Sequence, residues 1–319
     1  MMFFRLLEIT LKLTLCLPFK GKYIIIRIIF LPLHILFLPH YVFMVHYKRM
    51  KCLLESLGTV FIKLGQSLSL KSFLFEKPLL EVLSHLQDSV QTLSTVDIKK
   101  HLAGNHISEN LGFLVEEKPI STASVAHVYK GKMFHRGTEQ IIAIKVIKNG
   151  IRKQIEKDFT IVYPLVKLAS KFLSPALQIV EVAKDIHTSL LQEVNLNNEA
   201  QNLMAIKRNV VFDATVKVPQ VFLEYSNETT LVMEFIDGVS VRKIIHGEYV
   251  GMNRKTIARN IVETYLNQVY RDGTFHADMH SGNILVMNDC TIALLDFGIV
   301  SSITKKDRRA VATMIYAFL

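Results

Sequence analysis

The sequence predicts an α+β fold with two lobes, in which strands dominate the first lobe and helices the second. Two segments rich in β-branched residues, 120–128 and 141–147, read as strands and are followed by a long helical stretch from 151 to 207. A short hairpin, at 284–286 and 291–295, is predicted inside the later, mainly helical half. Such a segregation of strands and helices is typical of α+β domains.

Length and composition support a folded domain with a substantial core. The chain has 319 residues, half of them hydrophobic, which is enough for one large domain or two small ones. Its three cysteines are far apart in the sequence, so neither a disulfide framework nor a zinc site is expected.

Proline and turn residues place the remaining elements. Pro164 and Pro175 are expected to divide the stretch 151–207 into two or three helices. The other predicted elements are a helical region at 48–86, a capped helix at 97–102, two strands within 221–235 and a helix at 256–270.

The positive charge is concentrated at the N-terminus. Of the net charge of +10, residues 1–51 carry +7, from eight basic residues against Glu8 alone. Residues 1–17 form a predicted amphipathic helix, and residues 28–47 contain no charged side chain apart from histidine. Basic residues beside apolar runs favour an anionic membrane surface over nucleic acid. We therefore expect an interfacial or hairpin anchor, with a pair of helices packed on a soluble domain as the alternative.

Residues 275–298 carry the most specific chemical signal. They read Phe-His-Ala-Asp-Met-His-Ser-Gly-Asn and, after the predicted hairpin, end in Asp-Phe-Gly, an order typical of the catalytic and metal loops of kinases. Asp278 is the candidate catalytic residue that would accept or orient the proton of an attacking hydroxyl. Asn283 and Asp296 are the candidate Mg²⁺ ligands. A single loop aspartate usually has no such role, but three residues in this order with a strand pair between them indicate a phosphotransfer site.

The other half of such a site requires a lysine on a strand and a glutamate on a helix. Lys145, in the segment Ala-Ile-Lys-Val, is the candidate for contacting the α- and β-phosphates, and Glu199 is its candidate partner. A hinge between Met233 and Ile236 would bind adenine, with Glu234 and Ile236 as the candidate contacts. Lysines on strand edges and carboxylates on helices are common, so these assignments depend on the catalytic motif.

Several features of ordinary protein kinases are missing from the sequence. The loop before Lys145 reads Ser-Thr-Ala-Ser-Val-Ala-His at 121–127, which excludes a Gly-rich phosphate loop. Ala277 stands where many protein kinases have arginine, so a phosphorylated activation loop would find no partner there. No Ala-Pro-Glu sequence follows Asp296. The usual platform for a protein substrate is therefore not expected.

Together these motifs resemble the UbiB family, also called AarF, of atypical kinases associated with ubiquinone biosynthesis. The resemblance extends over about residues 57–307 and includes the family's Lys-x-Gly-Gln signature at 63–66. It implies a kinase-like fold that uses ATP or ADP with Mg²⁺. It also implies that Ala123, Ser124 and Val125, in an alanine-containing loop, contact the nucleotide.

The resemblance also implies regulatory residues and partners. The family's paired helix acids match Glu193 and Glu199, the first of which is expected to meet Lys63 over the nucleotide cleft, with Gln66 beside it. Activity in the family is linked to ATP hydrolysis and to lipid or quinone precursors. We therefore expect a membrane lipid, a quinone precursor or a ubiquinone-biosynthesis complex as partner. The expected location is the cytoplasmic face of a bacterial inner membrane or the matrix side of the mitochondrial inner membrane.

The sequence departs from the family in three places. Asn195 replaces an aspartate and so removes a charge that is expected beside the metal site. Met279 and Ser281 stand where the family usually has prolines. Only 21 residues follow Gly298, so an incomplete C-terminal helical lobe is expected. The predicted organisation is a membrane-associating segment at 1–50, a helical extension at 51–115, an N-lobe with a helical insertion at 116–236 and a partial C-lobe at 237–319.

Two other functions are compatible with the sequence. Small-molecule kinases resembling aminoglycoside and choline kinases share the pattern His-x-Asp-x-His-x-x-Asn found at 276–283, although the Lys-x-Gly-Gln segment argues against them. A non-catalytic nucleotide-binding partner of a biosynthetic complex is favoured by Asn195 and opposed by the intact Asp278 and Asp296.

Overall fold

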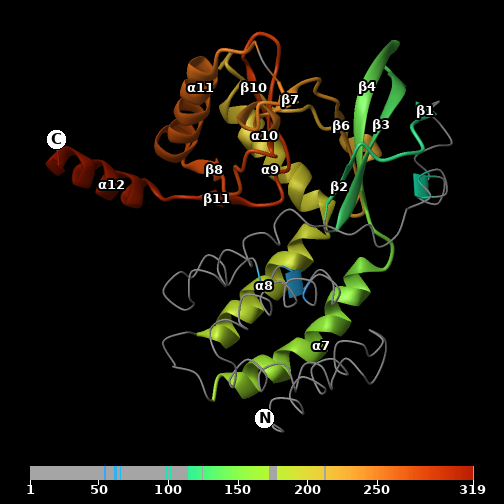
Figure 1. Cartoon of the computed structure of the whole chain (residues 1–319), viewed down its shortest axis with the longest axis vertical. Coiled ribbons are helices and arrows are strands. Elements are labelled where there is room, and N and C mark those ends of the chain that lie inside the picture. Colours follow the sequence, from blue (N-terminus) through green and yellow to red (C-terminus); the bar gives the residue numbers. More distant parts are fainter. Residues whose placement is uncertain are drawn as a thin grey trace, which may run out of the picture. The chain divides into compact units, whose positions relative to one another are not determined.

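The computed structural model divides the chain into two compact units. One unit comprises residues 1–93 and 153–190, and the other comprises residues 94–152 and 191–319 (Figure 1). The residues that the structure describes are 54, 61–62, 65, 98, 101–102, 114–123, 125–171, 178–211, 213–249 and 251–318.

An antiparallel sheet forms the first half of the second unit. Its centre is a long hairpin of β3 (Ala126–His135) and β4 (Thr138–Ile147), which stands upright in Figure 1. The edge beyond β4 is β6 (Thr230–Glu234), and two short strands, β1 (Leu114–Val115) and β2 (Ser121–Thr122), pair with β3.

A tight turn sets the length of this hairpin. Arg136 and Gly137 both have positive φ, at 50° and 80°, as the two-residue turns that match strand twist require. The sequence prediction of a strand at 120–128 was therefore wrong in its bounds, because the turn signal at Arg136–Gly137 was not recognised and β3 continues to it. The prediction of a strand at 141–147 was right in position, and β4 starts three residues earlier.

One hydrophobic cluster holds this sheet together. Its buried members come from β3, β4 and β6, from the helical residues before the sheet and from the segment before β6. They are Ile98, Leu102, Tyr129, Met133, Ile142, Ile144, Val146, Phe222 and Val232. Alternate residues of β3 and β4 point into this cluster, as expected for strands. The intervening residues Ala143, Lys145 and Ile147 of β4 are buried as well. The helical state of Ile98, His101 and Leu102 agrees with the predicted helix at 97–102.

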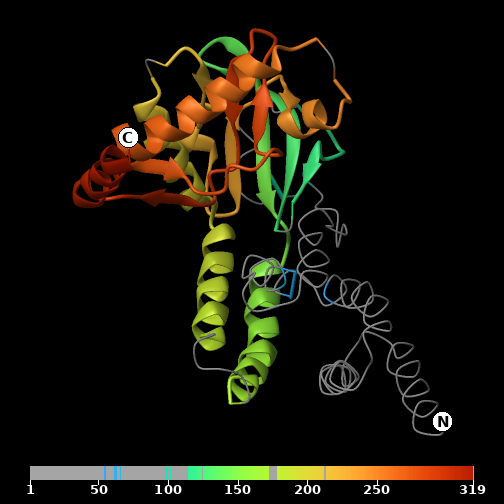
Figure 2. The same cartoon turned by 60° about the vertical axis from the view of Figure 1, so that its left-hand side comes forward.

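The other half of the second unit consists of helices and short strands. Strands β5 (Val216–Lys217), β10 (Ile292–Leu294), β9 (Ile284–Val286) and β7 (Val239–Ser240) form one sheet in that order, and β8 (Thr274–His276) pairs with β11 (Val300–Ser302). The hairpin of β9 and β10 confirms the strand pair predicted at 284–286 and 291–295. The helices are α9 (Leu196–Asn209), α10 (Val241–Ile245), α11 (Arg254–Leu266) and α12 (Lys305–Phe318) (Figure 2).

Two sequence predictions in this unit need correction. The stretch 221–235 contains one strand, β6, because residues Leu223–Tyr225 form a 3-10 turn and Val221 makes only an isolated bridge. The helix predicted at 256–270 begins at Arg254, where the Asn253 side chain accepts hydrogen bonds from the next turn, and it continues as a π-helix over Asn267–Asp272. The π-helix ends at Gly273, which has a φ of 74°.

Helices α7 (Ile151–Ala169) and α8 (Ile179–Glu193) contribute residues 153–190 to the first unit. The rings of Phe159 and His187 stack with their centroids 4.0 Å apart, so the two helices pack on each other. Pro164 lies inside α7. The described part of the stretch 151–207 contains three helices, α7, α8 and α9 (Leu196–Asn209), as predicted, but Pro164 does not divide them, because the flanking residues continue the helix past the one hydrogen bond that proline removes.

The predicted membrane-associating segment, residues 1–50, and most of the predicted helical extension lie outside the described residues. Among the residues that are described, no helix is both long enough and apolar enough to cross a bilayer.

Candidate active site

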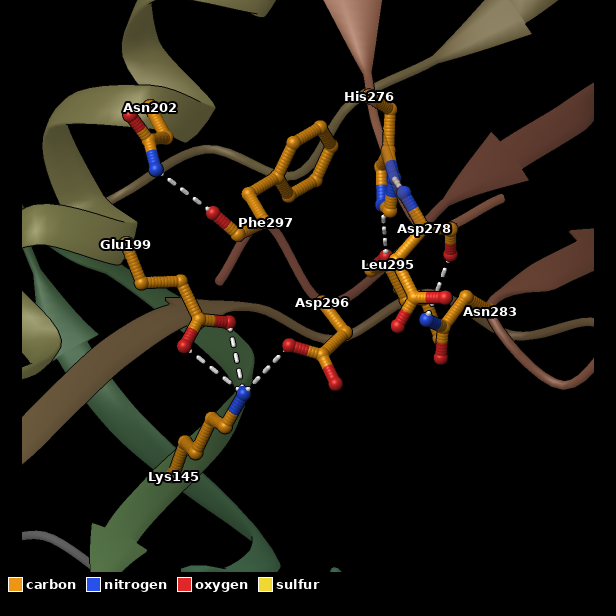
Figure 3. A network of polar contacts seen from close by, with 9 residues as sticks. All are labelled: Lys145, Glu199, Asn202, His276, Asp278, Asn283, Leu295, Asp296 and Phe297. Carbon is orange, nitrogen blue, oxygen red and sulfur yellow. Dashed lines mark hydrogen bonds and ion pairs between the residues drawn. The ribbon is translucent and has the colours of Figure 1, made fainter. Parts of the chain in front are cut away.

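Lys145 lies at the centre of a buried cluster of charges. Its Nζ donates to both carboxylate oxygens of Glu199, at 2.8 Å each, and to Oδ1 of Asp296 at 2.9 Å (Figure 3). Strand β4 supplies the lysine, α9 the glutamate and the loop after β10 the aspartate. Lys145 and Glu199 are only 7% and 4% exposed. The contact expected between Lys145 and Glu199 is thus present.

Burial and pairing together set the ionisation of these three groups. Burial alone would lower the pKa of Lys145, but the carboxylates of Asp296 and Glu199 outweigh it and raise that pKa. Burial raises the pKa of Glu199, and the Lys145 ammonium opposes this. The same ammonium lowers the pKa of Asp296 to about 2, against the effect of burial. Asp296 is therefore fully ionised at neutral pH, with 43% of its side chain exposed.

The backbone around Asp296 is held in an unusual conformation. Its φ is 57°, in the left-handed region that non-glycine residues seldom adopt and that is frequent at functional sites. On one side, the Leu295 amide donates to the Asn283 carbonyl at 2.8 Å. On the other, the Gly298 amide donates to the Asp296 carboxylate.

His276 connects two loops, the catalytic loop at 276–283, which carries Asp278 and Asn283, and the metal loop at 295–298, which carries Asp296. The Asp278 amide donates to its Nδ1 at 3.1 Å, so Nε2 carries the hydrogen in the neutral ring and donates to the Leu295 carbonyl at 3.0 Å. The His276 amide donates to the buried Gln268 Oε1 at 2.9 Å. Asp278 is exposed, so its carboxylate is accessible to a substrate hydroxyl.

Asn283 and Asp296 carry oxygens of the kind that Mg²⁺ prefers as ligands. Asn283 Nδ2 donates to the Asp278 carbonyl at 3.2 Å, which directs the amide nitrogen to that carbonyl and the amide oxygen away from it. In Figure 3 the Asp296 carboxylate lies between Lys145 and the pair Asp278 and Asn283. The described residues contain no cluster of three or more His, Cys, Asp or Glu side chains that could hold a metal alone. Two protein oxygens are a usual set for Mg²⁺ when substrate phosphates supply further ligands.

The alanine-containing loop is fastened by Lys148. The Lys148 amide donates to the Val125 carbonyl at 2.9 Å, and its Nζ donates to the Ala123 carbonyl at 2.8 Å. Lys148 is 4% exposed, and burial lowers its pKa. Ser124, the third residue expected to contact the nucleotide, lies outside the described residues. Lys148 was not among the residues predicted from the sequence, because nothing in its spacing distinguishes it from a solvent-exposed lysine.

The predicted hinge follows the end of β6. The amides of Glu234 and Phe235 donate to the carbonyls of Gln220 and Ile141, at 2.8 and 3.1 Å. Adenine recognition at the hinge would therefore rely on the Glu234 carbonyl and the Ile236 amide. The Glu234 side chain pairs with Lys217 at 2.6 Å, and Ile236 is buried.

The regulatory assignments are only partly visible. Lys63 and Gln66 lie outside the described residues, so the contact of Lys63 with Glu193, the last residue of α8, stays a prediction. Asn195 is the N-cap of α9, where its Oδ1 accepts from the Asn197 amide at 3.1 Å. The family's aspartate could fill the same capping position.

Asn202 is a second residue of the site that was not predicted from the sequence. Its Nδ2 donates to the Phe297 carbonyl at 2.9 Å. It lies three residues after Glu199 on α9, and this spacing could have indicated it, because residues three apart share a helix face.

Comparisons with known proteins agree with this geometry. A family model described as the ABC1 atypical kinase-like domain matches residues 85–319. A protein of Aeromonas salmonicida named "Probable protein kinase UbiB" is 37% identical over 284 residues, which cover 85% of this chain and 50% of that protein. One of the same name from Erwinia tasmaniensis is 35% identical, with 85% and 51% covered. The chain spans about half the length of these relatives.

A solved structure shows the same fold. The complex of Rv3197 with erythromycin, from Mycobacterium tuberculosis, matches with a TM-score of 0.52 at 23% identity, covering 75% of this chain and 60% of that one. The α+β, kinase-like fold predicted from the sequence is thereby confirmed.

Proposed function

Because the chain belongs to the ABC1 atypical kinase family, we propose that it binds ATP with magnesium and promotes transfer or hydrolysis of the γ-phosphoryl group. The observation that carries the proposal is the position of Lys145, between Glu199 and Asp296. This arrangement presents a fixed cation to the phosphates and an ionised carboxylate to the metal.

The residues of the chain would act mainly by positioning and electrostatics. The ammonium of Lys145, held by Glu199, would stabilise the negative charge of the α- and β-phosphates. Asp296 and Asn283 would bind Mg²⁺, which when bound neutralises phosphate charge. Asp278 would accept or orient the proton of the attacking hydroxyl or water, and His276 would hold the backbone of Asp278.

The biological role that we propose follows from the relatives. Proteins named "Probable protein kinase UbiB" match 85% of the chain. The UbiB family that the sequence motifs resemble is associated with ubiquinone biosynthesis. We propose that this chain acts in the same setting, on a membrane lipid or quinone precursor or within a biosynthetic complex. Recovery of the full chain and of a chain starting at Lys51 in membrane and soluble fractions tests the location. Equal recovery of both in the soluble fraction would contradict an N-terminal anchor.

The nucleotide proposal is tested by thermal-shift titration with ATP or ADP, with and without Mg²⁺. Asp296→Asn should lose the Mg²⁺-dependent part of the stabilisation, and Lys145→Met should lose most of the nucleotide effect. Asp185→Asn and Lys132→Met are matched controls, because Asp185 is exposed on helix α8 and Lys132 is exposed on strand β3. Unchanged Mg²⁺-dependent stabilisation of Asp296→Asn would overturn the metal assignment.

A non-catalytic nucleotide-binding role is the second candidate, and Asn195 is the observation that favours it, since an aspartate is usual at this position in the family. A single-turnover assay with Mg-ATP separates the two functions. An enzyme should convert bound ATP and lose this ability in Asp278→Asn, whereas a binding protein should return ATP intact in both forms.

A further inference from the structure

Helix α9 holds both polar backbone groups of Phe297. The Phe297 amide donates to the Glu199 carboxylate, and the Phe297 carbonyl accepts from Asn202 Nδ2 at 2.9 Å. Glu199 and Asn202 are one turn apart on the same face of α9, as Figure 3 shows. The Phe297 ring itself is fully buried. The metal loop is thus fastened to this helix immediately after Asp296.

The preceding residue explains why such a fastening matters. Asp296 has a φ of 57°, and an aspartate in this region is less stable than in the ordinary regions of backbone space. A strained residue persists only when its surroundings restrain it. The Leu295 side of Asp296 is bonded to Asn283 and His276, so the two bonds from α9 to Phe297 restrain the opposite side.

We propose that Asn202 is a positioning residue for the metal loop. By holding the Phe297 carbonyl, it keeps Asp296 in the left-handed conformation that directs one carboxylate oxygen to Lys145 and leaves the other for the metal. The expected effect of Asn202 on nucleotide binding rests on the proposed function. The expected effect of Asn202 on the conformation of the loop does not.

The chemistry of the amide distinguishes this role from simple packing. Asn202→Asp has the same shape but replaces the donor with a carboxylate that would face the Phe297 carbonyl, so it should loosen the loop more than Asn202→Ala. Gln201→Ala is the matched control, because Gln201 is the neighbouring amide on α9 and is exposed. A packing role predicts the reverse order for the two Asn202 variants, since aspartate preserves the volume.

The first test is amide hydrogen exchange of the full chain without nucleotide. The opening of the Phe297 and Gly298 amides should increase about five- to tenfold in Asn202→Ala, as expected for one lost hydrogen bond, and more in Asn202→Asp. Gln201→Ala should match the wild type. Unchanged exchange over residues 295–298 in both Asn202 variants, or a smaller effect of Asn202→Asp, would overturn the proposal.

The second test measures nucleotide affinity with and without Mg²⁺. Asn202→Ala should reduce the gain in affinity that Mg²⁺ provides and leave the Mg²⁺-free affinity close to that of the wild type. When Asp296→Asn is already present, adding Asn202→Ala should not change further the gain in nucleotide affinity that Mg²⁺ provides. Equal losses with and without Mg²⁺, or an additive loss in that background, would overturn the positioning role. If the wild type fails to bind nucleotide, the proposed function fails while the exchange experiment still decides the role of Asn202.

Discussion

Replacing Lys145 by methionine should destabilise the protein, and the loss should grow with pH. Methionine has a similar length, so the substitution mainly removes the charge that lies 2.8 Å from both oxygens of Glu199. Glu199 is 4% exposed and would be left as a buried, unpaired carboxylate. Removing one partner of a buried ion pair typically costs about 3–5 kcal/mol, a large share of the roughly 5–15 kcal/mol that stabilises most domains.

The dependence on pH follows from the direction of the pKa shift. Burial raises the pKa of Glu199, and removal of the Lys145 ammonium takes away the main opposing effect. A group whose folded pKa exceeds its unfolded pKa binds a proton on folding, so stability falls as pH rises between the two values. One such group changes the free energy of unfolding by about 1.4 kcal/mol per pH unit between its unfolded pKa and its raised folded pKa.

Urea unfolding at pH 5, 6 and 7 measures this effect directly. The variant Lys145→Met should lose stability relative to the wild type over this range, and Lys145→Met with Glu199→Gln should lose less. Asp296 loses the same ammonium, and burial then raises its pKa as well, so the contribution of Glu199 is the part of the slope that Glu199→Gln removes. A loss in Lys145→Met that is independent of pH, or that is equally large in the double variant, would refute this account of Glu199.

Three further predictions concern Lys148, Asn195 and Asp158. Lys148→Met should weaken nucleotide binding about tenfold in calorimetric titration by freeing the Ala123 carbonyl, and Lys148→Arg should restore much of it. Asn195→Ala should lower the free energy of unfolding by about 1 kcal/mol through loss of the α9 cap, whereas Asn195→Asp should retain it in urea unfolding. Burial raises the pKa of Asp158 on α7 to about 6, so ionising it costs stability as pH rises toward that value, and Asp158→Asn should raise the melting temperature more at pH 7 than at pH 5.

The sequence predicted those elements whose ends are marked by nearby turn residues. The hairpin of β9 and β10 was placed almost to the residue, because each strand is a short apolar run bounded by polar turn residues. The bounds of β3 were missed because the turn at Arg136–Gly137 lacks the asparagine or aspartate that usually marks it. Pro164 was misread because the residues on both sides of it continue α7 across the one hydrogen bond that proline removes.

The residues of the active site also differ in whether a local sequence motif reveals them. Asp278, Asn283, Asp296 and Lys145 stand in motifs whose spacing reflects the chemistry, and a sequence can reveal them. Asn202 acts on a backbone carbonyl 95 residues away, and Lys148 acts on the loop 25 residues before it. The sequence does not show which distant carbonyl such a side chain contacts. The spacing of Asn202 from Glu199 indicates a shared helix face, but the contact of Asn202 with Phe297 becomes visible only in the fold.

The contacts of α9 make the two halves of the site interdependent. The Glu199 carboxylate accepts both from Lys145 and from the Phe297 amide, and Asn202 on the next turn donates to the carbonyl of the same residue. A displacement of α9 that separates Glu199 from Lys145 would therefore also release the loop that carries Asp296. The phosphate-binding cation and the metal-binding carboxylate should then be lost together. Asn202→Ala breaks only the second connection, so its effect on Mg²⁺-dependent binding measures how strongly the helix couples the two.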